Sequence, residues 1–296
     1  MNFTNADRDR SSSVFVFVVA AYALSIALSL VIGLTGGYQS RLIGLGYLSM
    51  VIPSAAVLIT KWVTRDYVPS LVWNRFPLHY LPVALFLMPV VMHMAMLPAA
   101  AIAGRLHWQD WLTPQADGLY HTPETRGWGV LTATGLAARI ATNALVGLAV
   151  VSSLALLEEV GWRAWLLPRL IDRMGARRAV AVSSVIWALW HTPYALSGIQ
   201  HLDGVPAPLT AVIVPIGIAG SGLIIGWLWL RTESIWTVAL AHGALNNWGQ
   251  YAFKFVAGPG EFHDAMVLGA GGLALVAVGS LLLRRVRPEA AMERTV

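Results

Sequence analysis

Long apolar stretches are the feature that most constrains what this chain can fold into. A helix needs about 20 mostly apolar residues to cross the hydrocarbon core of a bilayer. Eight stretches near that length are bounded by charged or turn-forming residues, and they cover residues 14–34, 42–60, 79–104, 129–157, 179–196, 208–230, 235–253 and 265–283. We therefore predict an all-α fold, a polytopic integral membrane helical bundle of about eight transmembrane helices.

The composition excludes several other classes of protein. Apolar side chains make up 57% of the 296 residues and charged ones only 12%, against about 25% charged residues in a soluble domain. The chain has no cysteine, so disulfides, thiol catalysis and cysteine metal clusters are excluded. The net charge of +5 comes from arginines scattered at the ends of apolar stretches, so no nucleic-acid partner is expected.

The loop charges predict the orientation in the membrane, because Lys and Arg accumulate in short cytoplasmic loops. Loops rich in Lys and Arg alternate with loops poorer in them. The basic residues of the first set are Lys61, Arg65, Arg75, Arg169, Arg173, Arg177, Arg178, Arg231, Arg284, Arg285 and Arg287. Eight spans with both termini in the cytoplasm fit this alternation, and the composition suits a bacterial cytoplasmic membrane. No repeat or linker divides the chain, so residues 1–296 are predicted to form one membrane domain.

Ionisable residues inside the spans are the candidate functional groups. Charged side chains are unfavourable in a bilayer, and those that occur there usually face a protein interior or an aqueous cavity. The segment LALLEEVGWRAWLL places two carboxylates and an arginine in an apolar helix. Glu159 and Arg163 are four residues apart and can pair along one face. Glu158 lies about 100° around the helix from that pair, so it has no local partner and is the candidate general base. An ion-pair cluster without chemistry is the alternative for this segment.

Two later spans carry histidines. His191 is predicted about midway through the fifth span, where a core histidine bonded to a nearby carbonyl is the plain alternative. His242 and Asn246 are four residues apart and project from one face of the seventh span, although such a pair can also join helices, as Asn247 is expected to do. If packing brings these groups together around one water, they suffice for hydrolysis: a base, an imidazole that shares the proton, and donors for an oxyanion.

These residues resemble the CPBP family of intramembrane glutamic endopeptidases, which includes CAAX prenyl endopeptidases of the Rce1 type and bacterial Abi proteins. The family's EExxxR motif reads Glu158 to Arg163, its FxxxH motif reads Trp187 to His191, and its HxxxN motif reads His242 to Asn246. Trp187 stands where phenylalanine is usual, an exchange that we expect to reshape the wall of the site and leave its chemistry untouched. The motif-bearing core covers approximately residues 130–253.

The resemblance implies an intramembrane endopeptidase that acts on membrane-associated proteins or peptides. It implies that Glu158 and His191 activate a water, and that His242 and Asn246 stabilise the oxyanion. Glu159 and Arg163 would support them. Substrate identity, prenylation of the substrate, a role in maturation or in bacteriocin self-immunity, and oligomeric state are not specified by any residue.

No cofactor is expected. A carboxylate and two imidazoles can bind Zn²⁺, so zinc is the alternative, although the chain has no HExxH motif. Three other functions stay open. A serine protease would use Ser221, whose Gly-Ser-Gly context is explained more simply by helix packing. A proton-coupled transporter would use the same ionisable residues as a relay, and a non-catalytic membrane scaffold would retain the fold alone.

Overall fold

The computed structural model describes residues 5–66, 76–104, 106, 113–121, 128–202, 204–249 and 263–286. Most of these residues are helical, which confirms the all-α bundle. The main helices are α1 (Asn5–Gly33), α2 (Ile52–Thr64), α3 (Leu81–Ile102), α5 (Ala133–Thr142), α6 (Leu148–Glu159), α7 (Leu167–Met174), α8 (Ala176–Trp190), α9 (Thr192–Leu196), α10 (Ala207–Thr232), α11 (Ile235–Trp248) and α13 (His263–Arg284).

Shorter elements join these helices. Single 3₁₀ turns or short 3₁₀ segments are η1 (Gly37–Gln39), η2 (Ile43–Val51) and η3 (Leu78–Tyr80). The strands β1 (Tyr120–His121) and β2 (Val130–Leu131) pair antiparallel in a small hairpin beside the start of α5. Two residues in each strand leave the all-α class unchanged.

Seven helices in the described part of the chain are long and apolar enough to span a membrane: Ser12–Gly33, Ile43–Thr64, Leu78–Ile102, Ala133–Met174, Ala176–Leu196, Ala207–Thr232 and Ala265–Arg284. The expected seventh span, residues 235–253, is not among them and corresponds to α11, which has 14 residues. Such a helix is about 21 Å long at 1.5 Å per residue, short of the roughly 30 Å hydrocarbon core. Residues 250–253 of that expected span lie outside the described residues.

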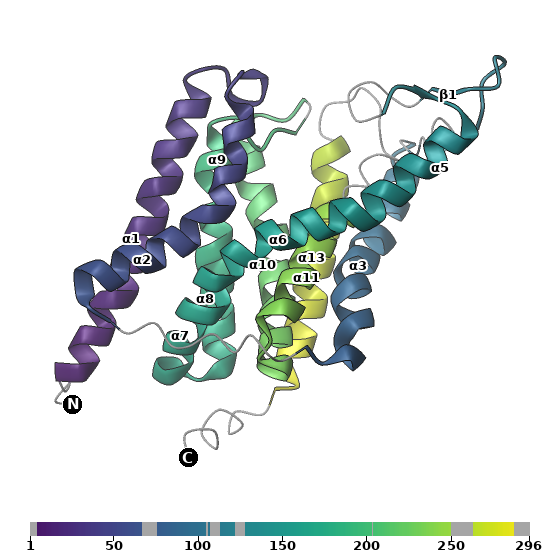
Figure 1. The fold of residues 1–296 in the computed structure, drawn as a ribbon. Helices are drawn as coiled ribbons and strands as arrows, with labels where there is room; N and C mark the ends of the chain where they lie inside the picture. The colour runs from purple at the N-terminus through teal and green to yellow at the C-terminus, as the bar shows by residue number, and fades with distance from the viewer. Residues whose placement is uncertain are drawn as a thin grey trace.

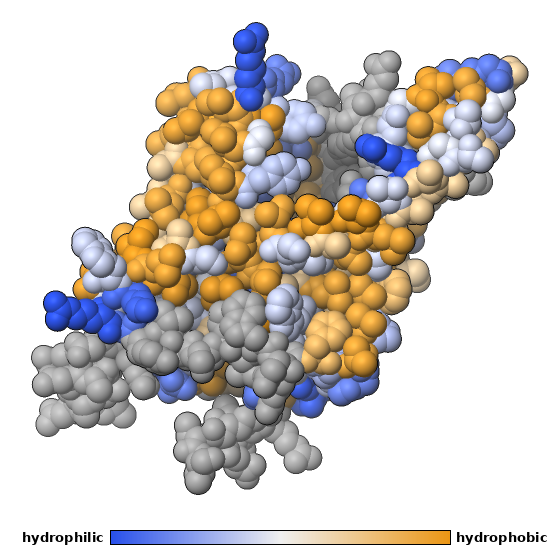
Figure 2. All heavy atoms as spheres, in the orientation of Figure 1, coloured by the Kyte–Doolittle hydropathy of each residue, from blue (hydrophilic) through white to orange (hydrophobic). Residues whose placement is uncertain are grey.

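The helices pack as an elongated bundle in which the first turn of α1 and the last turn of α13 lie at the same end (Figure 1). At this end Arg177, near the start of α8, donates hydrogen bonds to the carbonyl oxygens of Arg284 and Val286 at 2.8 and 2.6 Å. Arg169 of α7 also pairs there with Asp66 at 3.1 Å. The apolar side chains cover most of the middle of the face seen in Figure 2, with hydrophilic residues toward its ends, as a membrane protein requires.

The fourth span differs from the expected residues 129–157, because its helix continues to Met174. Ala133–Met174 is one helical rod of 42 residues that crosses the bundle obliquely in Figure 1. Two π-helical segments interrupt the α-helical geometry, η4 (Asn143–Gly147) and η5 (Val160–Leu166). The second follows Glu159 directly, and such wide turns are often found at functional sites.

Small residues allow α10 to lie close to its neighbours. A side chain at Gly220 would meet the backbone of α13 at Val276, and one at Gly217 would lie 3.6 Å from Gly272. Ser221 donates to the carbonyl oxygen of Gly217 at 2.8 Å within α10 itself. The Gly-Ser-Gly sequence therefore serves helix packing, as the simpler interpretation predicted.

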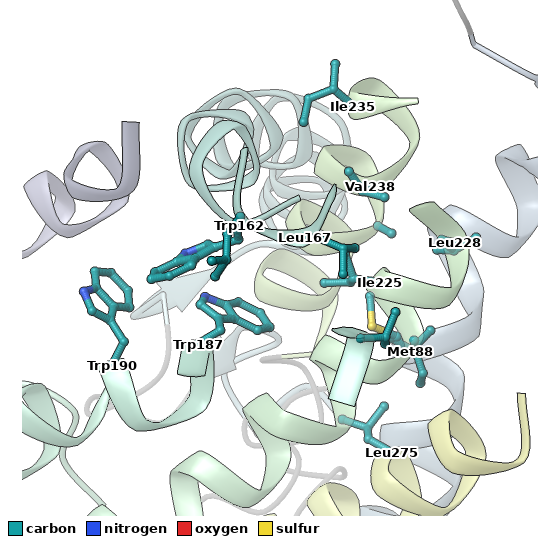
Figure 3. Packing of buried hydrophobic residues seen from close by; sticks show 14 of the residues in the cluster. Met88, Trp162, Leu167, Trp187, Trp190, Ile225, Leu228, Ile235, Val238 and Leu275 are labelled. Carbon is teal, nitrogen blue, oxygen red and sulfur yellow. The ribbon is translucent and has the colours of Figure 1, made fainter. Parts of the chain in front are cut away.

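The core of the bundle is rich in tryptophan at one end. Figure 3 shows the indole rings of Trp162, Trp187 and Trp190 grouped together, while Met88 and Leu275 lie toward the other side of the same core. All three tryptophans are buried, with 2% exposure or less. Trp190 donates its N–H to the carbonyl oxygen of Ala21 at 3.1 Å, which fixes α8 against α1 beside the motif residues.

Candidate active site

The two adjacent glutamates at the end of α6 are both buried and have different partners. Glu159 Oε1 accepts a hydrogen bond from Arg163 at 2.9 Å, so the predicted pairing along one helix face is present. Glu158 Oε2 accepts a hydrogen bond from the indole Nε1 of Trp187 at 3.0 Å. Glu158 thus has no partner on its own helix, as its position around the helix predicted, and its donor comes from α8.

His242 joins the pair formed by Glu159 and Arg163. Its Nδ1 lies 2.8 Å from the same Glu159 Oε1 atom, and the imidazole is 3% exposed. Ser234 caps α11 by accepting a hydrogen bond from the N–H of Thr237. This cap sets where the helix begins and therefore the position of His242 along the bundle. The hydrogen bond commits Nδ1 to Glu159, so Nε2 is the nitrogen available for other chemistry.

His191 lies at the junction of α8 and α9 and not within a continuous helix. Pro193 lacks the N–H that would extend the hydrogen-bond ladder of α8, and the chain turns at His191 before α9 begins. His191 Nδ1 lies 2.9 Å from the carbonyl oxygen of Trp187. Because a carbonyl only accepts hydrogen bonds, Nδ1 carries the proton, and a neutral imidazole then presents Nε2 as an acceptor.

Trp187 is the residue that connects the three motif-bearing helices. Its ring lies edge-on to His242 with centroids 5.1 Å apart and edge-on to His191 at 5.6 Å. The Arg163 guanidinium lies over the same ring, 4.4 Å from its centroid. Glu158, His191 and His242 are therefore gathered around one buried indole, and we did not predict this from the sequence.

The two asparagines of α11 are placed differently. Asn246 lies one turn beyond His242, as predicted, but its side chain is exposed. No hydrogen bond joins it to the other candidate residues within the described parts of the chain. Asn247 is buried, and its Nδ2 donates to the carbonyl oxygen of Asn143 at 2.9 Å. The expectation that Asn247 joins helices is confirmed.

The backbone around the glutamates is held by α2. The change from α- to π-helical geometry after Glu159 alters the backbone hydrogen-bond pattern, and the carbonyl oxygen of Leu157 accepts a hydrogen bond from Ser54 Oγ at 2.5 Å. A side chain at Gly161 would meet the backbone of Pro53, so glycine permits this close approach. These contacts fix the orientation of the turn that carries both carboxylates.

A second close approach positions His242. A side chain at Gly243 would collide with Ser152 of α6, so α6 and α11 come together with almost no intervening side chain. This contact brings His242 within hydrogen-bonding distance of Glu159. Glycine at this position is a signal that was visible in the sequence but was not used in predicting the site.

A cavity of about 390 Å³ lies between α6 and α11, beside the contact of Gly243 with Ser152. Its walls are mainly apolar, and they consist of Phe76, Ser152, Ser153, Leu156, Trp236, Ala239 and Leu240. Leu156 precedes Glu159 by three positions, and Ala239 precedes His242 by three. Three positions are close to one helical turn. The cavity therefore lies next to the α6–α11 contact at which Glu159 and His242 form their hydrogen bond.

The arrangement of donors bears on metal binding. Among the described residues, no three His, Asp or Glu side chains form a group that could hold a metal ion. Both histidines use Nδ1 in hydrogen bonds to the protein and leave Nε2 available, an arrangement that is also found in metal-bound imidazoles. The expectation of no cofactor therefore stays a prediction, with zinc as its alternative.

The fold and this site define a polytopic integral membrane protein in which buried carboxylates and imidazoles from separate helices meet. Residues 139–248 match the family model described as type II CAAX prenyl endopeptidase Rce1-like. This stretch contains all three motifs and lies within the predicted core, so this part of the chain is similar to the type II CAAX prenyl endopeptidases. The resemblance seen in the sequence is confirmed. No curated protein matches the chain.

Proposed function

We propose that the protein is an intramembrane endopeptidase that cleaves membrane-associated proteins with a water activated by Glu158 and His191. The observation that carries this proposal is the division of partners between the two adjacent glutamates. Glu159 bonds to Arg163 and His242, whereas Glu158 bonds only to the neutral indole of Trp187 within the described residues. A carboxylate whose hydrogen-bond donor is neutral keeps an oxygen available to take a proton from water, as a general base must.

The proposed reaction begins with a water between Glu158 and His191. Glu158 Oε1 and His191 Nε2 are the acceptor atoms left by the hydrogen bonds described above, so each can accept one hydrogen of the water. As the water oxygen attacks the peptide carbonyl carbon, one proton passes to this pair. The same proton is then available to the leaving amine as the carbon–nitrogen bond breaks.

His242 and Asn246 are proposed to stabilise the oxyanion of the tetrahedral intermediate. With Nδ1 donating to Glu159, His242 offers a donor to the oxyanion through Nε2–H in its imidazolium form. The Asn246 amide is one helical turn away and is exposed to an incoming substrate. Glu159 and Arg163 act as positioning residues for His242.

The substrate's apolar segment is proposed to lie in the cavity between α6 and α11. This cavity is lined by Leu156 and Ala239, each about one helical turn from Glu159 or His242, and its apolar walls suit a peptide that arrives from the bilayer. We propose that the protein lies in a bacterial cytoplasmic membrane with both termini in the cytoplasm, because the basic residues near the ends of α2, α7, α10 and α13 follow the positive-inside pattern.

The substrates can be found by comparing membrane peptides from cells that carry the wild-type protein or Glu158→Gln. The proposal predicts new peptide ends in wild-type cells that are missing from Glu158→Gln cells at equal protein abundance. Identical peptide profiles would contradict it. Proton flux that depends on Glu158, without cleavage of any peptide, would favour the transporter.

A further inference from the structure

The indole N–H of Trp187 is the feature of the site that the family motif, with phenylalanine at this position, does not account for. We propose that Trp187 is a positioning residue that sets the orientation of the Glu158 carboxylate, an inference that rests on the proposed function. The hydrogen bond between them is 3.0 Å long and joins α8 to α6. Trp187 is 2% exposed and Glu158 is 4% exposed, so water does not compete freely for this contact.

The indole is held on two sides and cannot easily turn away from Glu158. The Arg163 guanidinium lies 4.4 Å from the centroid of one ring face, and the His242 ring packs edge-to-face at 5.1 Å. Arg163 is itself fixed by its ion pair with Glu159. The direction of the Trp187 N–H is therefore determined by the ion pair of the neighbouring glutamate.

This hydrogen bond gives the two carboxylate oxygens of Glu158 different roles. Oε2 accepts from the indole, and Oε1 is left for the water that the reaction requires. Without the indole, both oxygens would compete for that water and the carboxylate could rotate about its last side-chain torsion. A fixed carboxylate holds the acceptor in the geometry in which proton transfer is fast.

Trp187 also positions the second group of the pair through its backbone. Its carbonyl oxygen accepts from His191 Nδ1 at 2.9 Å, which fixes the imidazole tautomer. One residue therefore orients both groups that are proposed to share the water, the carboxylate through its side chain and the imidazole through its main chain. A phenylalanine would keep the main-chain contact and a smaller aromatic ring, but it has no donor for Glu158.

The test compares Trp187→Phe with Trp190→Phe. Trp190 is a matched control, because it lies on the same helix, is 1% exposed, packs edge-on to His191 at 4.9 Å and donates its N–H to the Ala21 carbonyl. Cleavage of a lipid-anchored peptide is measured in liposomes. We expect kcat to fall about 10- to 100-fold in Trp187→Phe, since hydrogen bonds to charged groups are the strong ones, with KM unchanged and the unfolding temperature close to that of Trp190→Phe. Trp190→Phe should retain kcat.

A second measurement reads the hydrogen bond without catalysis. In protein labelled with ¹⁵N-tryptophan, the indole resonance lost in Trp187→Phe identifies the Trp187 N–H. We expect Glu158→Gln to shift this resonance and to leave that of Trp190 in place. The inference is overturned if the Trp187 resonance does not respond to Glu158→Gln, or if Trp187→Phe keeps the wild-type kcat. A shifted resonance in a protein without any peptidase activity would instead overturn the proposed function and with it the catalytic role of Trp187.

Discussion

The imidazole of His242 pairs with Glu159 and not with Glu158, through a 2.8 Å contact between Nδ1 and Oε1. This contact assigns the two consecutive glutamates to different tasks. Glu159 lies at the centre of a buried ion cluster with Arg163, and Glu158 lies outside it against a neutral indole. The assignment rests on which atoms the carboxylates contact, which spacing along one helix could only suggest.

Arg163→Met should destabilise the protein strongly. The substitution leaves the fully buried Glu159 without its cationic partner, and breaking a buried pair in this way costs about 3–5 kcal/mol. The double variant Glu159→Gln/Arg163→Met should recover much of that stability, because no uncompensated charge is left inside. Thermal unfolding in detergent measures both. Equal unfolding temperatures for the single and double variants would contradict the buried pairing.

Gly243→Ala should reduce both stability and cleavage. The added methyl group would meet Ser152 and push α11 away from α6, and overpacking of this kind costs about 1–3 kcal/mol. The displacement also lengthens the contact between His242 and Glu159. Gly269→Ala is the matched control, since Gly269 lies in α13 with open space around it. If both alanine variants behave alike in unfolding and cleavage assays, the close approach is not needed.

Ser221→Ala should cleave peptides at the wild-type rate. The Ser221 hydroxyl is used within α10, where it donates to the Gly217 carbonyl, and its neighbours pack against α13. The variant separates the glutamate mechanism from a serine mechanism, because a serine nucleophile cannot be replaced by alanine without loss of activity. A fall of more than about 100-fold in kcat, with the fold intact, would support the alternative in which Ser221 is the nucleophile of a serine protease.

Strong chelators should not remove activity. Glu158, His191 and His242 are proposed to act directly on water and substrate, and no group of described side chains is arranged to hold a metal. The measurement compares cleavage rates before and after prolonged exposure to a chelator, together with the metal content of the purified protein. Loss of activity that only zinc restores would instead support the metal alternative.

Much of the fold followed from residue patterns, while the contacts within the site did not. Apolar stretches locate helices because backbone N–H and C=O groups inside a bilayer must be hydrogen-bonded within the protein. The i, i+4 spacing also predicted the Glu159–Arg163 pair. By contrast, the continuation of the fourth helix to Met174 was missed, because a charged stretch was interpreted as a loop.

The π-helical turn after Glu159 and the role of Trp187 depend on tertiary packing. Ser54 and Pro53 of α2 shape that turn from a distant part of the chain, and an indole was treated as equivalent to a phenyl ring because its donor has meaning only once Glu158 is beside it. Asn246 shows the reverse case, since its spacing from His242 fits the motif while its side chain faces outward in this structure.

The central claim is that Glu158 activates the attacking water, and Glu158→Gln tests it most directly. The amide keeps the size of the side chain and can still accept from the Trp187 N–H, but it cannot take a proton from water. Purified wild-type and variant proteins are compared in liposomes with a lipid-anchored fluorogenic peptide. We predict a fall of about 10²- to 10⁴-fold in kcat, as expected for loss of a general base, at an unchanged unfolding temperature. Cleavage by Glu158→Gln at the wild-type rate would contradict the account.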